Sequence, residues 1–198
     1  MNYGLLAGGW ILYFTLHSFL AAEGVKRWAQ RTLGNAFRFY RLIYSTLATL
    51  GLLALLVFSG SIPSESFFAS EGLVRFLSFV LTTFGVIAIQ LAFRQYRLKA
   101  FLGLAEERNE MKIEGILKYV RHPIYTGLIL ITAGFFLFIP NLPTLVSCVC
   151  ILTYLPIGIY LEERKLIGVY GEKYLRYKQD VPALMPGMGS AFEQRAQE

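Results

Sequence analysis

The stretch that decides the fold runs from residue 123 to residue 161, PIYTGLILITAGFFLFIPNLPTLVSCVCILTYLPIGIYL, in which two apolar runs flank the short sequence IPNLP at 139–143. A helix that crosses a bilayer needs about 20 mostly apolar residues, and each run comes close to that length. Two prolines on either side of an asparagine favour a tight turn. The stretch therefore predicts a hairpin of two antiparallel membrane helices, 123–139 and 142–161.

Comparable apolar runs precede this hairpin, at residues 4–22, 41–60 and 73–94. Hydrophobic residues make up 55% of the 198 residues and charged residues only 16%, whereas soluble domains contain about 25% charged residues. This composition excludes an ordinary water-soluble domain. We expect an all-α integral membrane bundle of about five transmembrane helices. It forms a single membrane domain over 1–198, with three spans in 1–94 and a second half, 95–198, that ends in a cytoplasmic helical segment.

Positive charge is distributed unevenly along the chain. Of its 19 lysines and arginines, only Arg75 falls outside three segments, residues 26–41, 94–121 and 164–195. Positively charged loops tend to stay on the cytoplasmic side, so we expect these segments there, with the amino terminus outside and the carboxy terminus cytoplasmic. The formal charge of +6 could suggest nucleic acid. Basic residues between apolar runs are instead typical of membrane flanks, and no nucleic-acid partner is expected.

Two cysteines, Cys148 and Cys150, lie two residues apart within an apolar run, so a helix points them to different sides of its axis. Neither a disulfide nor a metal site is expected from this spacing. Both residues are interpreted as small members of the helix core.

Polar side chains inside the apolar runs cluster at one depth, near the ends that the charge pattern places in the cytoplasmic leaflet. They are His17, Ser45, Thr46, Thr49, Gln90, Arg94, Tyr125, Thr126, Glu162 and Glu163. A polar side chain is costly in hydrocarbon and tends to face a cavity or a partner, so their shared depth predicts a pocket open to the cytoplasm. Simpler explanations stay open: the hydroxyls can bond to their own helix backbone, Arg94 can extend to the interface, and His17 fits a packing role equally well.

The sequence YVRHPIYTG at 119–127 places a proline at the expected start of a helix, where proline is favoured. A helix amino terminus presents free N–H groups and a partial positive charge, which suit a carboxylate or a phosphate. Arg121 and His122 add donors beside it, and Tyr125 follows one turn later. A helix cap with an interfacial basic and aromatic belt explains the same residues equally well.

Two adjacent carboxylates, Glu162 and Glu163, end the last apolar run, where a helix carboxy terminus disfavours negative charge. They therefore need a positively charged ligand or cationic partners. The candidate partners are Arg121, Arg164 and Lys165.

An aromatic face follows these carboxylates. The tyrosines at positions 170, 174 and 177 have helical spacing and should lie on one side of a helix. That side could contact a ligand, or it could pack an interfacial helix onto the membrane.

Together these motifs resemble the isoprenylcysteine carboxyl methyltransferase and phospholipid methyltransferase superfamily of integral membrane enzymes. The resemblance covers roughly 95–187, where Arg-His-Pro-x-Tyr-x-Gly is followed by Glu-Glu-x-x-Leu, Tyr-Gly-x-x-Tyr-x-x-Tyr and Val-Pro in the order and spacing of that superfamily. The amino-terminal half, with FYRLIY at 39–44, is similar to a bacterial branch that includes methanethiol S-methyltransferases and proteins linked to denitrification. A bacterial inner membrane is therefore the expected location.

The resemblance implies methyl transfer from S-adenosylmethionine to a small or lipophilic acceptor, which is a thiol, a carboxylate or a lipid amine. Carboxylates and tyrosine faces suit the ammonium and sulfonium groups of this donor. The residues that the resemblance assigns to donor binding are Arg121, His122, Tyr125, Gly127, Glu162, Glu163, Tyr174 and Tyr177. Arg94 and Arg164 are the candidate catalytic residues, because a nearby cation would help a thiol to lose its proton.

The tail departs from relatives that act on prenylated cysteine, in which a basic residue often follows Val-Pro. Here Ala183 follows Val181 and Pro182, which favours a small or lipid-like acceptor over a prenylated protein. Two other functions stay open. One is an NADPH-dependent reductase of related fold, although paired carboxylates would repel the phosphates of NADPH. The other is a non-enzymatic accessory or transport protein. The oligomeric state is open as well, since Gly8-Gly9 suits helix contacts within or between chains.

Overall fold

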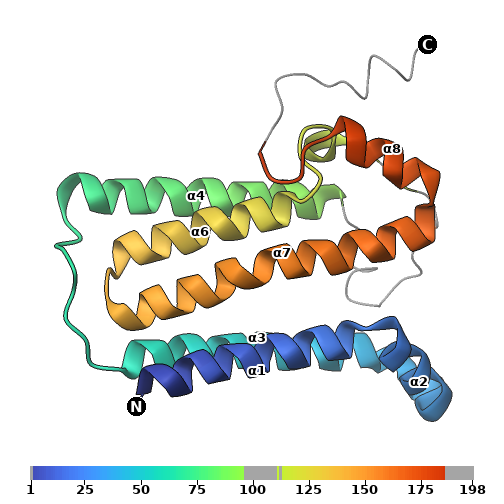
Figure 1. Ribbon diagram of the computed structural model, residues 1–198, viewed down its shortest axis with the longest axis horizontal. Coiled ribbons are helices and arrows are strands. Elements are labelled where there is room, and N and C mark those ends of the chain that lie inside the picture. The colour runs from blue at the N-terminus through green and yellow to red at the C-terminus, as the bar shows by residue number, and fades with distance from the viewer. Residues whose placement is uncertain (1, 96–110, 112, 186–198) are drawn as a thin grey trace.

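The computed structural model describes residues 2–95, 111 and 113–185, and the regular structure in these ranges is helical apart from one isolated bridge between Ser66 and Asn141. The helices are α1 (Asn2–Ala21), α2 (Glu23–Leu33), the 3-10 helix η1 (Gly34–Phe39), α3 (Tyr40–Ser61), α4 (Gly72–Gln95), the 3-10 helix η2 (Gly115–Lys118), α6 (Pro123–Phe138), α7 (Leu142–Tyr170) and α8 (Glu172–Asp180). The long helices α1, α3, α4, α6 and α7 run alongside one another as a bundle, and α2 and α8 lie at the same end of it (Figure 1). The all-α prediction is confirmed for the described residues.

Within the described ranges, four helices are long and apolar enough to cross a membrane: Asn2–Ala21, Leu42–Ser61, Gly72–Arg94 and Leu142–Tyr170. These four confirm an integral membrane protein. The apolar helix Pro123–Phe138 has 16 residues, fewer than the roughly 20 that a full crossing requires. A fifth span and the orientation of the two termini therefore stay predictions.

The hairpin of α6 and α7 is confirmed, but its second helix is longer than predicted. It extends to Tyr170, whereas the predicted helix ended at residue 161 with the apolar run. Glutamate, arginine and lysine favour helices as much as leucine does, so the charged residues 162–165 continue the helix. It ends at Gly171, whose φ of 55° is a conformation that glycine adopts easily.

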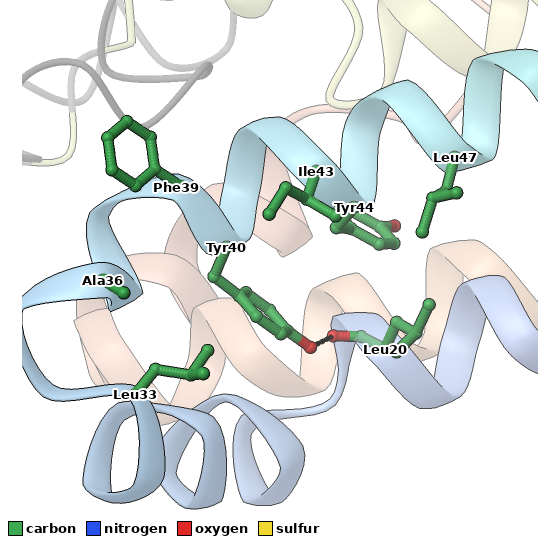
Figure 2. A pocket seen from close by; sticks show the side chains of 8 residues that line it. All are labelled: Leu20, Leu33, Ala36, Phe39, Tyr40, Ile43, Tyr44 and Leu47. Carbon is green, nitrogen blue, oxygen red and sulfur yellow. Dashed lines mark hydrogen bonds between the residues drawn. The ribbon is translucent and has the colours of Figure 1, made fainter.

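The first basic segment, treated in the sequence as a loop, folds into α2 and η1. Glu23 at the start of α2 lies 3.2 Å from Lys165 of α7 and 3.5 Å from Lys26. Burial alone would raise the pKa of Glu23, but the hydrogen bonds and charges of both lysines outweigh it and hold the pKa below its ordinary value. The Tyr40 hydroxyl donates to the Leu20 carbonyl at 2.8 Å and so ties the start of α3 to the end of α1 (Figure 2).

Helix α7 contacts both α6 and the helix pair α1 and α3. Nε1 of Trp10 in α1 donates to Oγ of Ser147 in α7 at 3.0 Å, and this hydroxyl donates to Oγ of Ser59 in α3 at 3.2 Å. All three side chains are buried, so each polar group needs the partner that it has. The chain of hydrogen bonds therefore fixes α1 and α3 against α7 on the side away from α2 and α8.

Small residues allow α4 and α6 to approach each other closely. A Cβ atom on Gly85 would lie 2.7 Å from the carbonyl oxygen of Gly127, and one on Gly127 would lie 2.6 Å from the carbonyl oxygen of Gly85. At Gly134 likewise, a Cβ atom would lie too close to Ser78 and Thr82 of α4. Close backbone contact through small residues is a common way for membrane helices to pack. It holds the amino-terminal part of α6 firmly against α4.

Replacing Gly85 by alanine is expected to destabilise the protein, although alanine is the better helix former. The added methyl group would lie 2.7 Å from a backbone oxygen, and overpacking of this kind costs roughly 1–3 kcal/mol. Thermal unfolding in detergent measures the effect. Gly8→Ala in α1 is the matched control, because nothing lies within 4 Å of its Cβ position. Equal melting temperatures for the two variants would contradict the close contact of α4 and α6.

Candidate functional site

The chain that follows α8 holds the residues that precede α6. The backbone N–H groups of Arg121 and His122 donate to the carbonyl oxygens of Pro182 and Ala183, both at 3.0 Å. Because Pro123 is the first residue of α6, these N–H groups lie outside the helix and need partners elsewhere. The Val-Pro element of the tail therefore positions two of the predicted site residues.

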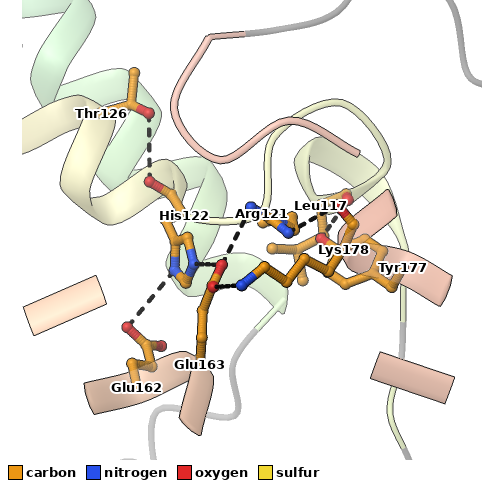
Figure 3. Close-up of polar contacts among 8 residues, drawn as sticks. All are labelled: Leu117, Arg121, His122, Thr126, Glu162, Glu163, Tyr177 and Lys178. Carbon is orange, nitrogen blue, oxygen red and sulfur yellow. Dashed lines mark hydrogen bonds and ion pairs between the residues drawn. The ribbon is translucent and has the colours of Figure 1, made fainter. Parts of the chain in front are cut away.

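Glu163 of α7 is the centre of a buried ion cluster (Figure 3). Its Oε1 lies 3.1 Å from Nη2 of Arg121 and 3.1 Å from Nε2 of His122, and its Oε2 lies 2.6 Å from Nζ of Lys178. The Glu163 side chain is 9% exposed, and those of Arg121 and His122 are 8% and 2% exposed. Lys178 is 44% exposed. Buried charges need paired charges, so this ion cluster ties α7, α8 and the start of α6 into one unit.

Glu162 has fewer partners than its neighbour. Its Oε2 lies 3.6 Å from Nδ1 of His122, and its side chain is 38% exposed. The Tyr125 ring meets the His122 ring edge to face at 5.6 Å. His122 therefore lies between one buried and one accessible carboxylate. An accessible carboxylate beside an aromatic ring suits a cationic ligand.

Of the three cations proposed as partners of the carboxylates, the structure confirms Arg121. Lys165 pairs instead with a carboxylate of α2, and Arg164 is exposed on α7. Lys178, which was not among the predicted partners, takes the remaining place beside the buried carboxylate. In the sequence, the only indication for Lys178 was that it directly follows Tyr177 in the aromatic element. The direction of the Lys178 side chain depends on how α8 docks.

Tyr174 and Tyr177 lie in a buried cluster with Val181 and are 2% and 4% exposed. Their rings meet edge to face at 5.8 Å, and the Tyr177 hydroxyl donates to the Leu117 carbonyl at 2.6 Å. This aromatic face packs α8 onto the rest of the protein, so the interpretation that it faces the membrane is wrong. A role for the two tyrosines in donor binding stays a prediction.

The remaining predicted residues lie apart from the ion cluster or at its edge. Gly127 is on the side of α6 that contacts α4, and Arg94 is exposed in the last turn of α4. Arg164 is on the wall of a cavity of about 170 Å³ beside the ion cluster. The other described residues that line this cavity are Tyr160, Glu163, Ile167 and Lys178. The binding role of Gly127 and the catalytic roles of Arg94 and Arg164 stay predictions.

Polar residues in the α2 end of the bundle also have partners. The Tyr44 hydroxyl lies 3.0 Å from Nδ1 of His17, and Oγ of Ser18 lies 2.7 Å from the Tyr154 hydroxyl. The Thr49 hydroxyl donates to the backbone carbonyl of Ser45 at 2.9 Å. This bond agrees with the simpler explanation that such hydroxyls bond to their own helix backbone. His17 is thus hydrogen-bonded within the bundle.

The family described as NnrU protein matches residues 5–189 of the chain. Similar proteins include a methanethiol S-methyltransferase of Pseudomonas sp. strain GM41(2012), 26% identical over 195 aligned residues, with 88% of this chain and 70% of the relative covered. Methanethiol S-methyltransferase 1 of Bradyrhizobium diazoefficiens is 29% identical over 192 aligned residues, with 88% and 64% covered. A protein-S-isoprenylcysteine O-methyltransferase of Schizosaccharomyces pombe is 30% identical over 87 aligned residues, with 42% and 37% covered.

The chain spans 44% to 72% of the length of the methanethiol S-methyltransferases that it matches. No solved structure matches the chain. The matches to the two Pseudomonas and Bradyrhizobium proteins include both halves of the bundle, whereas the match to the yeast protein covers less than half of the chain.

Proposed function

The chain belongs to the NnrU protein family, and we propose that it is an integral membrane methyltransferase that uses S-adenosylmethionine as its methyl donor. The observation that carries the proposal is the meeting of residues 121–125 and 162–163 in one site, with a buried ion cluster and an accessible carboxylate. Relatives named as methyltransferases, similar over most of the chain, support the same reaction.

The residues at this site fit the groups of the donor. Glu162 is accessible, and with the Tyr125 ring it can hold an ammonium or a sulfonium group. Lys178 is partly exposed, and Nε of Arg121 is buried without a hydrogen-bond partner among the described residues, so both can serve a carboxylate. The 170 Å³ cavity has room for roughly six water-sized groups. The cavity is lined by Lys178 but not by Glu162 or Tyr125, so we propose that it receives only the part of the donor that contacts Lys178.

S-adenosylmethionine, when bound, supplies a methyl group on a sulfonium that is a good leaving group. The protein then has mainly to hold donor and acceptor in line, which is a large contribution to the rate. Glu163 keeps Arg121 and His122 in fixed positions, and Glu162 faces the donor. A thiol acceptor must also lose a proton, and a cation beside the thiolate would favour this loss. Arg164, on the wall of the cavity, is the first candidate for that cation, and Arg94 is the second.

The proposed acceptor is a thiol that is small or lipophilic. The relatives that match most of the chain are named methanethiol S-methyltransferases, whereas the relative named protein-S-isoprenylcysteine O-methyltransferase matches less of it. A carboxylate and a lipid amine remain the alternatives, and labelled methyl transfer to a panel of all three kinds of acceptor distinguishes them.

In the membrane, α6 is proposed to be a fifth and short span. Its 16 residues extend roughly 24 Å at about 1.5 Å per residue, against a hydrocarbon core of about 30 Å. A helix that is too short can be accommodated by local thinning of the bilayer. With five spans, the distribution of positive charge supports an amino terminus outside and an ion cluster at the cytoplasmic surface of a bacterial inner membrane.

The purified protein is expected to bind S-adenosylmethionine and S-adenosylhomocysteine in calorimetry and to transfer a labelled methyl group to a thiol. His122→Ala should weaken this binding at least severalfold, because His122 positions Glu162 and contacts Glu163. His17→Ala is the matched control, since His17 is the only other histidine of the chain. Absence of both heat and thermal shift with either compound would refute the methyltransferase proposal.

A further inference from the structure

A groove lies at the corner where α1, α2, η1 and α3 meet (Figure 2). Its volume is about 270 Å³, which is room for roughly nine water-sized groups. Leu20, Leu33, Ile43 and Leu47 are among the residues that line it, and none of the lining residues whose side chains the structure describes is charged. Ile43 and Leu47 are 57% and 56% exposed, so the groove opens to the outside of the helix pair. In a membrane that side faces lipid.

A ligand in the groove would contact apolar atoms even where tyrosines form the wall. The Tyr40 hydroxyl is occupied by the Leu20 carbonyl at 2.8 Å, and the Tyr44 hydroxyl lies 3.0 Å from Nδ1 of His17. A charged or strongly polar group would lose its hydration in this groove and find no charged partner among the described side chains of its walls. The groove is therefore suited to an apolar group.

The accessible carboxylate of the site faces the same corner of the molecule. Lys165 of α7 pairs with Glu23, the first residue of α2, at 3.2 Å. Glu162 precedes Lys165 by three residues, so the two side chains lie on one face of the helix. Glu162 consequently points from α7 toward the side of the bundle where α2 begins.

Hydrogen bonds through α1 connect the groove to the helix face on which Glu162 lies. Tyr44 lines the groove and lies 3.0 Å from Nδ1 of His17, and the Tyr154 hydroxyl of α7 lies 2.7 Å from Oγ of the next residue of α1, Ser18. Tyr154 shares its face of α7 with position 158, four residues later. Gly158 of α7 gives Tyr125 its space, because a Cβ atom there would lie 3.1 Å from the Tyr125 hydroxyl. An elongated ligand with its reacting end near Tyr125 would thus have its other end directed toward the groove.

We propose that this groove holds the apolar substituent of the methyl acceptor, which is a neutral thiol carrying a hydrocarbon group. The inference rests on the proposed methyltransferase function and names the substrate class of that site. A group of up to about eight to ten carbons fills the groove if each carbon takes roughly the volume of a water molecule. The thiol enters from the bilayer, since the groove opens on the lipid side of α1 and α3.

The reaction balances without any further reactant. The thiol releases its proton to water at the exposed side of Glu162, and the thiolate sulfur forms a bond to the methyl carbon. The bond between that carbon and the donor sulfonium breaks, and its electron pair stays on the donor sulfur. The products are a neutral methyl thioether, S-adenosylhomocysteine and one proton.

Methyl transfer to straight-chain alkanethiols of increasing length, with the protein in phospholipid nanodiscs, tests the inference. Leu20→Trp narrows the groove but keeps the backbone carbonyl that Tyr40 uses. We expect it to raise the KM for octanethiol at least tenfold and to change the KM for methanethiol less than twofold. Leu16→Trp is the matched control, because Leu16 lies one turn earlier on α1, is 50% exposed and does not line the groove. Both KM values should stay within twofold of wild type in this control.

Two further measurements separate the possible failures. Both tryptophan variants should retain the wild-type affinity for S-adenosylhomocysteine; a wild-type protein that binds no donor would refute the methyltransferase proposal itself. If the donor binds and the two variants show the same dependence on chain length, the groove holds only membrane lipid and the inference is wrong. Leu33→Trp fills the groove from α2 and should reproduce the effect of Leu20→Trp, so misfolding of one variant leaves the test intact.

Discussion

Glu163→Ala is expected to lower the melting temperature of the protein by roughly 10 °C, because removing one partner of a buried ion pair costs about 3–5 kcal/mol. The substitution leaves Arg121 and His122, which are 8% and 2% exposed, without the carboxylate between them. Lys178 adds little to the effect, since it is 44% exposed and water can solvate it. Thermal unfolding followed by circular dichroism in detergent measures the change.

The matched control is Glu162→Ala, one residue earlier on the same helix. Glu162 is 38% exposed and contacts His122 only at 3.6 Å, so its loss should change the melting temperature by no more than about 2 °C. Glu163→Gln should fall between the two, because the amide keeps the shape of the side chain and one acceptor oxygen. A Glu163→Ala protein as stable as the Glu162→Ala protein would show that the ion cluster does not hold α8 and the start of α6 together.

The meeting of His122 and Glu163 was predictable because of where their motifs lie on the hairpin. One motif precedes the first helix of the hairpin and the other comes near the end of the second, so antiparallel packing brings them to the same end. Two prolines and an asparagine between the apolar runs were a sufficient signal for that packing. The polar residues inside the apolar runs also lie near the ends that the charge pattern assigns to one leaflet. They independently indicated that these ends lie close together.

The partners of individual charges could not be predicted in the same way. Arg164 and Lys165 directly follow Glu163, but successive helix residues are rotated by about 100°, so these neighbours point in different directions. Lys178 reaches the buried carboxylate only because the aromatic face of α8 docks on the end of α7. That docking is a tertiary contact that no local pattern specifies.

Gly127 shows a related limit. The motif suggested a ligand beside this glycine, whereas the structure places it against Gly85 of α4, 42 residues earlier in the chain. The sequence contains small residues at both positions, but it does not reveal that α4 and α6 are neighbours. Helix packing explains the absence of a side chain at 127, and the binding role of Gly127 stays a prediction.

Glu162→Gln is expected to lower the affinity for S-adenosylmethionine by roughly 10- to 100-fold, because a hydrogen bond to a charged group contributes about 1.5–3 kcal/mol. The amide removes the negative charge but keeps the size of the side chain. Calorimetry with the donor measures the loss, and labelled methyl transfer should fall with it. The fold should be unchanged, since this carboxylate is 38% exposed and lies outside the buried ion cluster.

The contrast between the two adjacent carboxylates distinguishes a binding site from a structural one. If Glu163 stabilises the fold and Glu162 faces the ligand, substitution of Glu163 lowers the melting temperature and substitution of Glu162 lowers donor binding at constant stability. Glu23→Gln is the control for a general effect of charge, because Glu23 is also partly exposed and pairs with Lys165 on the same face of α7. It should leave donor affinity within twofold of wild type. Full donor affinity in Glu162→Gln would mean that the accessible carboxylate does not contact the donor, and the donor would then have to bind elsewhere on the protein.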